Sequence, residues 1–423
     1  MGRAPWSEMA PEQAQHRPAD LFTIGIFLLS VGSLLIYTQG WVMPLFGDKV
    51  DPAASTLIRN LFLPAYAAGL LMFALQPGQG TKVLMRQPFL VILMLIVAAS
   101  TMWSIAPDQT SRRVIAVGCT TLSGVMLAAR YRWSTLAEIV GACFLVVTVA
   151  SLIVCVAVPS IGRMTELFPG AWRGLWPEKN SLGGNMALAF VSLAAAALLN
   201  KKRAWLWGGG AGLALFLVLM STSKTSLVSL LLGVAAMGFV MVARRGPAHG
   251  VAASWTAVTG IMLLAGFIIF ASDVFFAILG KDATLTGRTK IWAAALHQIQ
   301  LRPWTGYGYG AVWDETSGWG PLAWIVKEAQ FKARHAHNAW LEQWLGLGIG
   351  GLAAFGLFWL QALAMNIVAV FRDKGAYLAF PYFIVYSLMS LTESIGTVYN
   401  DLRWVLFVAL AVKLTWPDRY IKD

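Results

Sequence analysis

The chain has 423 residues, of which 58% are hydrophobic and only 12% charged, and its formal net charge is +12. A soluble globular domain carries about 25% charged residues, so this composition indicates a polytopic integral membrane protein. The positive charge does not indicate a nucleic-acid partner, because the basic residues lie in short clusters between apolar segments, where membrane topology already predicts them. Cys119, Cys143 and Cys155 all lie in apolar runs, which argues against a disulfide framework or a metal site.

Residues 1–20 are polar and contain three prolines, which predicts a short disordered cytoplasmic tail rather than a signal peptide. Apolar segments long enough to cross a bilayer core of about 30 Å follow. We expect twelve, at 21–41, 57–75, 88–103, 110–129, 134–158, 181–199, 205–221, 223–243, 251–271, 337–370, 376–394 and 400–416. The tenth is longer than a bilayer requires, and its glycines between Gly346 and Gly351 predict a bend.

Basic clusters set the predicted orientation. With the N-terminus inside, the even-numbered connections and the C-terminal tail carry the basic residues, while the opposite short connections are nearly bare. This bias predicts that both termini are cytoplasmic. The chain is thus expected to be all-α, with a tail (1–20), nine membrane helices (21–271), one large periplasmic loop (272–336) and three C-terminal helices with a short tail (337–423).

The shorter outer loop, 159–180, combines aromatic and basic residues just before a helix that we expect to start after Pro177, capped by Asn180 or Ser181. A helix N-terminus presents free N–H groups and partial positive charge. Arg173 and Lys179 would add formal charge, so this loop is a candidate anion-binding site that includes Asn180. The alternative is interfacial anchoring by tryptophan and lysine.

The large outer loop is too long and too aromatic for a spacer. A helix that continues to residue 300 would place Arg288 and Trp292 on one face, where a guanidinium suits phosphate oxygens and a ring suits a sugar. The alternative is a structural arginine stacked on Trp292. The glycines at 306, 308 and 310 enclose Tyr307 and Tyr309 and predict a tight turn that approaches a ligand or another loop.

His335 and His337 precede the tenth apolar segment, between Arg334 and Asn338. Their spacing by two puts the rings on different faces, and no third ligand nearby supports a metal site. A histidine is well suited to proton transfer at neutral pH, so His337 is the candidate general base. His335, one step further into the loop where solvent can reach it, is expected to support that loop. A hydrogen-bonded interfacial role is the alternative for both.

Five stretches taken together resemble the O-antigen ligase and polysaccharide polymerase superfamily, particularly its exopolysaccharide-polymerase branch. They are 103–107 with 111–113, 172–183, 287–292, 303–308 and 335–351. In the last stretch His337-Asn338 is followed, after nine residues, by Gly348 and then Gly351, which is similar to the ligase signature.

The resemblance implies a glycosyltransferase-C-like enzyme of the bacterial inner membrane that catalyses inverting, metal-independent glycosyl transfer without a cofactor. Its donor would be an oligosaccharide on undecaprenyl diphosphate, and its acceptor a growing glycan. Other exopolysaccharide assembly proteins are possible partners. Arg173 and Arg288 would hold the diphosphate, and His337 would act on the acceptor hydroxyl; Lys179, Asn180, Trp292, Tyr307, Tyr309, Arg334, His335 and Asn338 would line the substrate site.

Three alternatives to a polymerase stay open. A ligase would move the glycan to lipid A core or to another acceptor, and the acceptor alone distinguishes it. A transporter of lipid-linked sugar would place ionisable residues at mid-membrane and broken helices in both halves of the chain. An inert scaffold in a secretion complex would leave the arginines of the outer loops unexplained.

Overall fold

The structure, a computed structural model, describes residues 21–47, 52–166, 168–270, 288–313, 320–330 and 334–421. The predicted tail 1–20 and parts of the large outer loop lie outside these residues. Each of the twelve predicted apolar segments overlaps one or two long helices. These are α1 (Leu21–Tyr37), α3 (Pro52–Leu61) with α4 (Leu63–Leu75), α6 (Pro88–Ala99), α7 (Pro107–Arg130), α8 (Trp133–Ala157), α10 (Lys179–Leu199), α11 (Ala204–Met220), α12 (Lys224–Ala243), α13 (Pro247–Phe270), α17 (Ala339–Arg372), α18 (Ala376–Thr392) and α19 (Leu402–Thr415).

Shorter helices connect these segments: α2 (Val42–Phe46), α5 (Pro77–Leu84), α9 (Pro159–Gly162), α15 (Arg288–Leu301) and α16 (Pro321–Ala329). In the part of the chain that is described, the only β pairing is an isolated bridge between Arg163 and Trp172. An all-helical fold follows from the sequence, because a long apolar segment in a membrane must satisfy its backbone groups internally.

Seven described helices are long and apolar enough to cross a membrane, and the number rises to eight if the pair α5 and α6, bent by 95°, counts as one span. The chain is therefore an all-α protein with several candidate membrane spans. The full count of twelve stays a prediction, since α1 and α18 are apolar but shorter than a usual span.

Helix boundaries follow local signals. Proline occupies the first turn of α4, α6 and α7, where its missing N–H removes no helical hydrogen bond. Side chains cap α12, α17 and α19 through Ser223, Asn338 and Asp401. The expected cap of α10 is wrong: the helix begins at Lys179 after Glu178, and no side chain caps it.

Helix α10 is the central helix of the region that carries the candidate site, and it packs against α8, α11, α12 and α18. Its first turns approach two neighbours closely because they carry glycine. A Cβ on Gly183 would lie 2.5 Å from the Ser226 Oγ of α12, and one on Gly184 would lie 2.6 Å from the Met389 Cε of α18. The N-termini of α10 and α12 and the C-terminus of α18 therefore share one rim.

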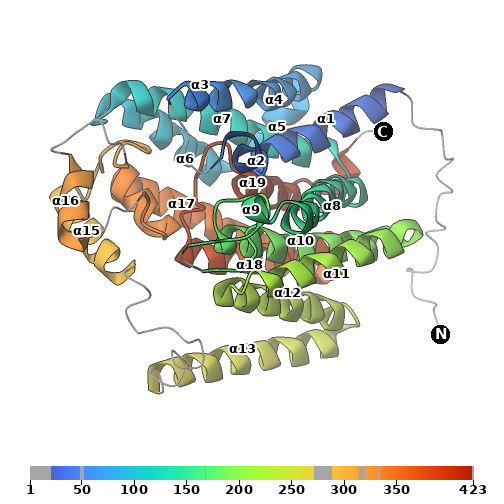
Figure 1. Cartoon of the computed structure of the whole chain (residues 1–423). Coiled ribbons are helices and arrows are strands. Elements are labelled where there is room, and N and C mark those ends of the chain that lie inside the picture. Colours follow the sequence, from blue (N-terminus) through green and yellow to red (C-terminus); the bar gives the residue numbers. More distant parts are fainter. Residues whose placement is uncertain are drawn as a thin grey trace, which may run out of the picture.

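The long helix α17 breaks at Gly348, whose φ of 68° is outside the helical region, as the glycine run predicted. The loop after α15 fills the break. Tyr307 N donates to Leu345 O at 3.0 Å, Gly308 N donates to Gly346 O at 2.9 Å, and Ile349 N donates to Pro303 O at 2.9 Å. This confirms that the predicted turn at Gly306–Gly310 approaches another segment. Helices α15 and α16 lie at one end of the helical body, at left in Figure 1.

Candidate functional site

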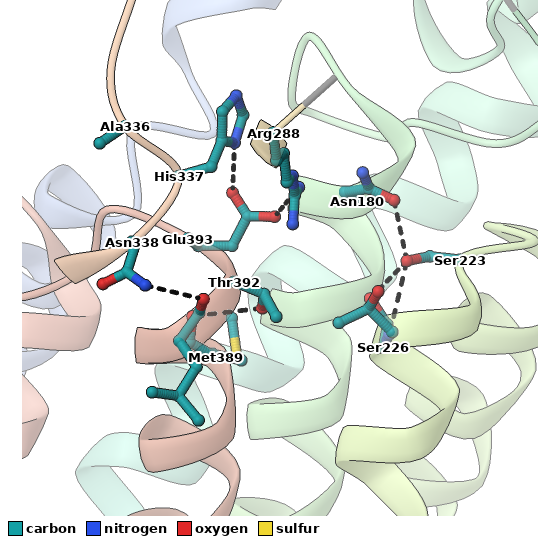
Figure 2. Close-up of polar contacts among 12 residues, drawn as sticks. Asn180, Ser223, Ser226, Arg288, Ala336, His337, Asn338, Met389, Thr392 and Glu393 are labelled. Atoms are coloured by element: carbon teal, nitrogen blue, oxygen red, sulfur yellow. Dashed lines mark hydrogen bonds and ion pairs between the residues drawn. The ribbon is translucent and has the colours of Figure 1, made fainter. Parts of the chain in front are cut away.

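A single carboxylate joins the two side chains that the sequence singled out most strongly. Glu393 accepts from Arg288 Nη2 on Oε1 at 3.1 Å, and its Oε2 lies 3.3 Å from His337 Nδ1 (Figure 2). The three side chains come from the first residue of α15, the segment before α17 and the C-cap of α18. They are 15%, 22% and 24% exposed for Arg288, His337 and Glu393, so the cluster is half-buried but accessible to a ligand.

The backbone before α17 fixes where His337 points. His337 has a φ of 50°, in the left-handed region, where a non-glycine residue costs on the order of 1–3 kcal/mol and needs support from its surroundings. Asn338 supplies that support on one side, because its Oδ1 accepts from Trp340 N at 2.9 Å and from Leu341 N at 3.1 Å. The predicted substrate residue Asn338 is thus the cap of α17.

Glu342, in the first turn of α17, supports the other side of His337. Its carboxylate accepts from Ala336 N at 2.6 Å, from Trp313 Nε1 at 2.7 Å and from Ser394 Oγ at 2.9 Å. Two of these donors are direct neighbours of His337 and Glu393 in the chain. Glu342 therefore fixes the distance between the two segments that carry the histidine and the carboxylate.

His335 lies against His337, with ring centroids 3.9 Å apart and an angle of 55° between the rings. Its Nδ1 is buried and has no hydrogen-bond partner among the described residues. Burial, reinforced by the neighbouring His337 ring, lowers the pKa of His335 to about 4. The expectation that solvent satisfies His335 is therefore wrong, and this ring is neutral at neutral pH. Arg334, by contrast, is exposed.

Glu393 is the acidic residue of this cluster. Burial alone would raise its pKa, but the hydrogen bond from His337 and the charge of Arg288 outweigh burial, so the pKa is lowered. The carboxylate is ionised at neutral pH, and it accepts the proton of His337 Nδ1 as a hydrogen bond. This arrangement leaves His337 Nε2 as the ring atom able to accept a proton.

The second part of the candidate site lies at the starts of α10 and α12. Asn180 Oδ1 accepts from Ser223 Oγ at 2.9 Å, and Ser226 Oγ donates to Ser223 Oγ at 2.8 Å (Figure 2). Lys179 Nζ lies 3.7 Å from the centre of the Phe168 ring.

Arg173, the other basic residue predicted for this part of the site, contacts backbone carbonyl groups. The Arg173 guanidinium donates to Ile161 O at 2.8 Å and to Ser160 O at 3.3 Å. The structure places Arg173 in contact with its own loop.

The aromatic residues of the large loop divide into two groups. Tyr307 and Tyr309 are 6% and 7% exposed, and their hydroxyls donate to Gln298 O at 3.0 Å and to Thr397 O at 2.8 Å. These contacts favour a structural role over sugar stacking.

Trp292 lies one turn after Arg288 on α15, as expected, and donates to Ala336 O at 2.8 Å. Among the described aromatics of the loop, Trp304 and Trp324 are the exposed ones, at 77% and 45%.

Sequence reasoning missed Glu393. The residue lies 56 positions after His337 and 105 after Arg288, so no local pattern links the three. One signal was present: Glu393 is the only acidic residue in the apolar segment 376–394 and lies near its end, and the predicted topology puts that end on the same side as His337.

Part of the chain matches a known protein family. Residues 209–356 match the family model described as O-antigen ligase. The predicted superfamily resemblance is confirmed. The matched range includes α15, with Arg288, and the segment that carries His335 and His337.

The chain is also similar to the exopolysaccharide production protein ExoQ of Rhizobium meliloti (strain 1021). The two are 29% identical over 264 residues, which is 58% of this chain and 59% of that protein. The match thus spans less than two thirds of the relative's length. It supports the exopolysaccharide branch of the superfamily.

Proposed function

We propose that the chain is a membrane-embedded glycosyltransferase that polymerises oligosaccharide repeats, carried on undecaprenyl diphosphate, into an exopolysaccharide. The observation that carries the proposal is the half-buried cluster in which Glu393 binds both Arg288 and His337. It combines a cation suited to phosphate oxygens with an oriented imidazole. The similarity to an exopolysaccharide production protein supports the product class.

In the proposed reaction, a hydroxyl oxygen of the acceptor sugar attacks the anomeric carbon of the donor, and the bond from that carbon to the diphosphate oxygen breaks. Attack from the face opposite the leaving group inverts the anomeric centre. His337 Nε2 takes the hydroxyl proton, and undecaprenyl diphosphate leaves with the bonding electron pair. The proton and electrons therefore balance without an oxidant or a reductant.

Arginine is the side chain that suits the leaving group. A diphosphate that departs gains negative charge, and a fixed guanidinium in a site of low dielectric constant stabilises that charge with little reorganisation. We assign this role to Arg288, with Arg173 as the second cation and Lys179 as a third. The proposed mechanism uses no metal ion, and a chelator should leave the activity intact.

The proposed location follows from the basic clusters. A multi-pass protein of the bacterial inner membrane, with both termini in the cytoplasm, would present Arg288 and His337 at the periplasmic face. There a lipid-linked donor could enter the site from the membrane while the glycan extends into the periplasm. Twelve spans and a glycosyltransferase-C-like arrangement are part of this proposal.

A ligase is the second candidate, and the family match is the observation that favours it. Reconstitution with defined lipid-linked repeats and sizing of the product tests both. A ladder of products supports a polymerase, whereas a single addition to a lipid acceptor supports a ligase. Repeats that cross the bilayer without any new glycosidic bond would contradict both and indicate a transporter.

A further inference from the structure

Arg288 already has an anionic partner in this structure. Its Nη2 donates to Glu393 at 3.1 Å, and the two side chains are only 15% and 24% exposed. Removing the partner of a buried charge is costly, because the remaining charge is left without compensation. A carboxylate beside Arg288 therefore stabilises the guanidinium while no substrate is bound. The same carboxylate also occupies guanidinium N–H groups that a diphosphate would need as hydrogen-bond donors.

The same carboxylate has a second partner. His337 Nδ1 lies 3.3 Å from the other oxygen of Glu393. A further charged group near Glu393 is Arg403 of α19, and it is engaged by Asp401, whose Oδ2 accepts from Arg403 Nη2 at 2.5 Å. Glu393 can consequently lose its bond to Arg288 and still keep His337 as a partner on the same side chain.

Charge decides which anion Arg288 prefers. A diphosphate carries more negative charge than one carboxylate and offers oxygens spaced for both arms of the guanidinium fork. We propose that Glu393 is a positioning residue that holds Arg288 while the site is empty, yields it to the donor diphosphate, and then acts on His337 alone. This inference rests on the proposed function of the same site.

This exchange, in which Arg288 leaves Glu393 and binds the donor diphosphate, would link donor binding to the chemical step. A carboxylate released from Arg288 accepts a stronger hydrogen bond from His337 Nδ1, which fixes the ring with Nε2 toward the acceptor. It also stabilises the imidazolium that forms when Nε2 takes the hydroxyl proton. Glu393 therefore opposes binding of the leaving group but supports proton transfer, and these two effects have opposite signs.

The variant Glu393→Gln separates the two effects, because it removes the charge and keeps the shape. We measure binding of inorganic pyrophosphate to the purified full-length protein, and turnover with lipid-linked repeats. Pyrophosphate should bind about 3- to 10-fold more tightly, since Arg288 no longer has a competing anion. Turnover should fall about 100-fold, since a neutral amide cannot stabilise the imidazolium. A residue with a merely structural role would not move the two constants in opposite directions.

Glu328→Gln is the matched control. Glu328 accepts from a histidine in the same way, with its Oε1 2.7 Å from His297 Nδ1, but it lies on α16 and outside the cluster. Both constants should stay at the wild-type value in this variant. If Glu393→Gln leaves both constants unchanged, or lowers affinity and turnover together, the exchange is overturned.

Two further variants keep the inference testable. If Glu393→Gln is not recovered in the membrane, Glu393→Asp replaces it, because a side chain one methylene shorter draws the carboxylate away from both Arg288 and His337. Tighter pyrophosphate binding with slower turnover then supports the exchange, and unchanged constants contradict it. Arg288→Ala separates this inference from the proposed function: if that variant binds and turns over normally, the proposed function fails. If Arg288→Ala is impaired but Glu393→Gln behaves like the wild type, the proposed function stands and only the role of Glu393 is contradicted.

Discussion

Gly306 lies directly against the backbone of Gly348, and a Cβ built on Gly306 would lie 2.7 Å from the Gly348 nitrogen. Both residues have a positive φ, 64° and 68°. At this point the loop after α15 enters the break in α17 and forms hydrogen bonds with its carbonyl groups. Arg288 begins α15, and His337 lies just before α17. The contact between the two glycines therefore fixes how the two sides of the candidate site meet.

Replacement of Gly348 by alanine should disrupt this contact. The new Cβ would lie 2.0 Å from Trp304 O, and the left-handed backbone adds a cost on the order of 1 kcal/mol or more. We expect Gly348→Ala to lower the midpoint of thermal unfolding in detergent and to reduce glycosyl transfer. Gly350→Ala is the control, because its nearest neighbour would be Ile96 Cδ1 at 3.9 Å. Equal stability of the two variants would contradict this reading of the contact.

The helices and the break in α17 could be predicted from the sequence, because apolar length and glycine act locally. The start of α10 was predicted less accurately than these features. Asn180 is a good capping residue, but its Oδ1 accepts a hydrogen bond from Ser223, the N-cap residue of α12. A tertiary partner thus replaced the local one. The same reason hid Glu393, whose role arises only when the ends of three helices meet.

The charge of Arg288 is predicted to act in the transition state. Arg288→Ala should reduce kcat/KM by about 30- to 1000-fold, which corresponds to about 2–4 kcal/mol. Arg288→Lys should restore little, because a point charge cannot reproduce the guanidinium fork. Lys290→Ala removes a charge from the exposed face of the same helix and should have little effect. Near-normal activity of Arg288→Ala and of Arg173→Ala would identify both arginines as anchors.

The lowered pKa of His335, about 4 against an ordinary value of 6.5, predicts how stability depends on pH. Between these two values the unfolded chain binds a proton that the folded protein does not, so stability falls as the pH falls through this window. The loss from pH 7 to pH 5 is about 2 kcal/mol for this group. Glu393 does not contribute there, because its pKa is lowered from 4.5 and its stabilising effect is lost only at more acidic pH.

Thermal unfolding at pH 7 and pH 5 measures this loss. His335→Asn removes the titrating group and should reduce the difference between the two conditions. His297→Asn, which alters an exposed histidine on α15, should keep the wild-type difference. An unchanged difference in His335→Asn would show that another group causes the acid sensitivity.

The predicted orientation can be tested independently of catalysis. Reporter fusions after Arg203 and after Arg245 should give a cytoplasmic signal, because these positions follow basic clusters. Fusions near Lys179 and near Tyr309 should give a periplasmic signal. A cytoplasmic signal at Tyr309 would place Arg288 and His337 on the wrong side for a donor presented outside, and the proposed site would then be untenable.

The two histidines should respond differently to substitution. His337 has Nδ1 engaged by Glu393 and Nε2 available, whereas His335 has a buried Nδ1 without a described partner and a ring packed against His337. His337→Ala should abolish product formation while pyrophosphate binding and the amount of protein in the membrane stay normal. His335→Ala should reduce activity and leave a measurable rate, because it removes packing behind the base. If His335→Ala is the inactive variant and His337→Ala retains activity across pH 5–8, then His335 is the functional histidine and the assignment of the base to His337 is wrong.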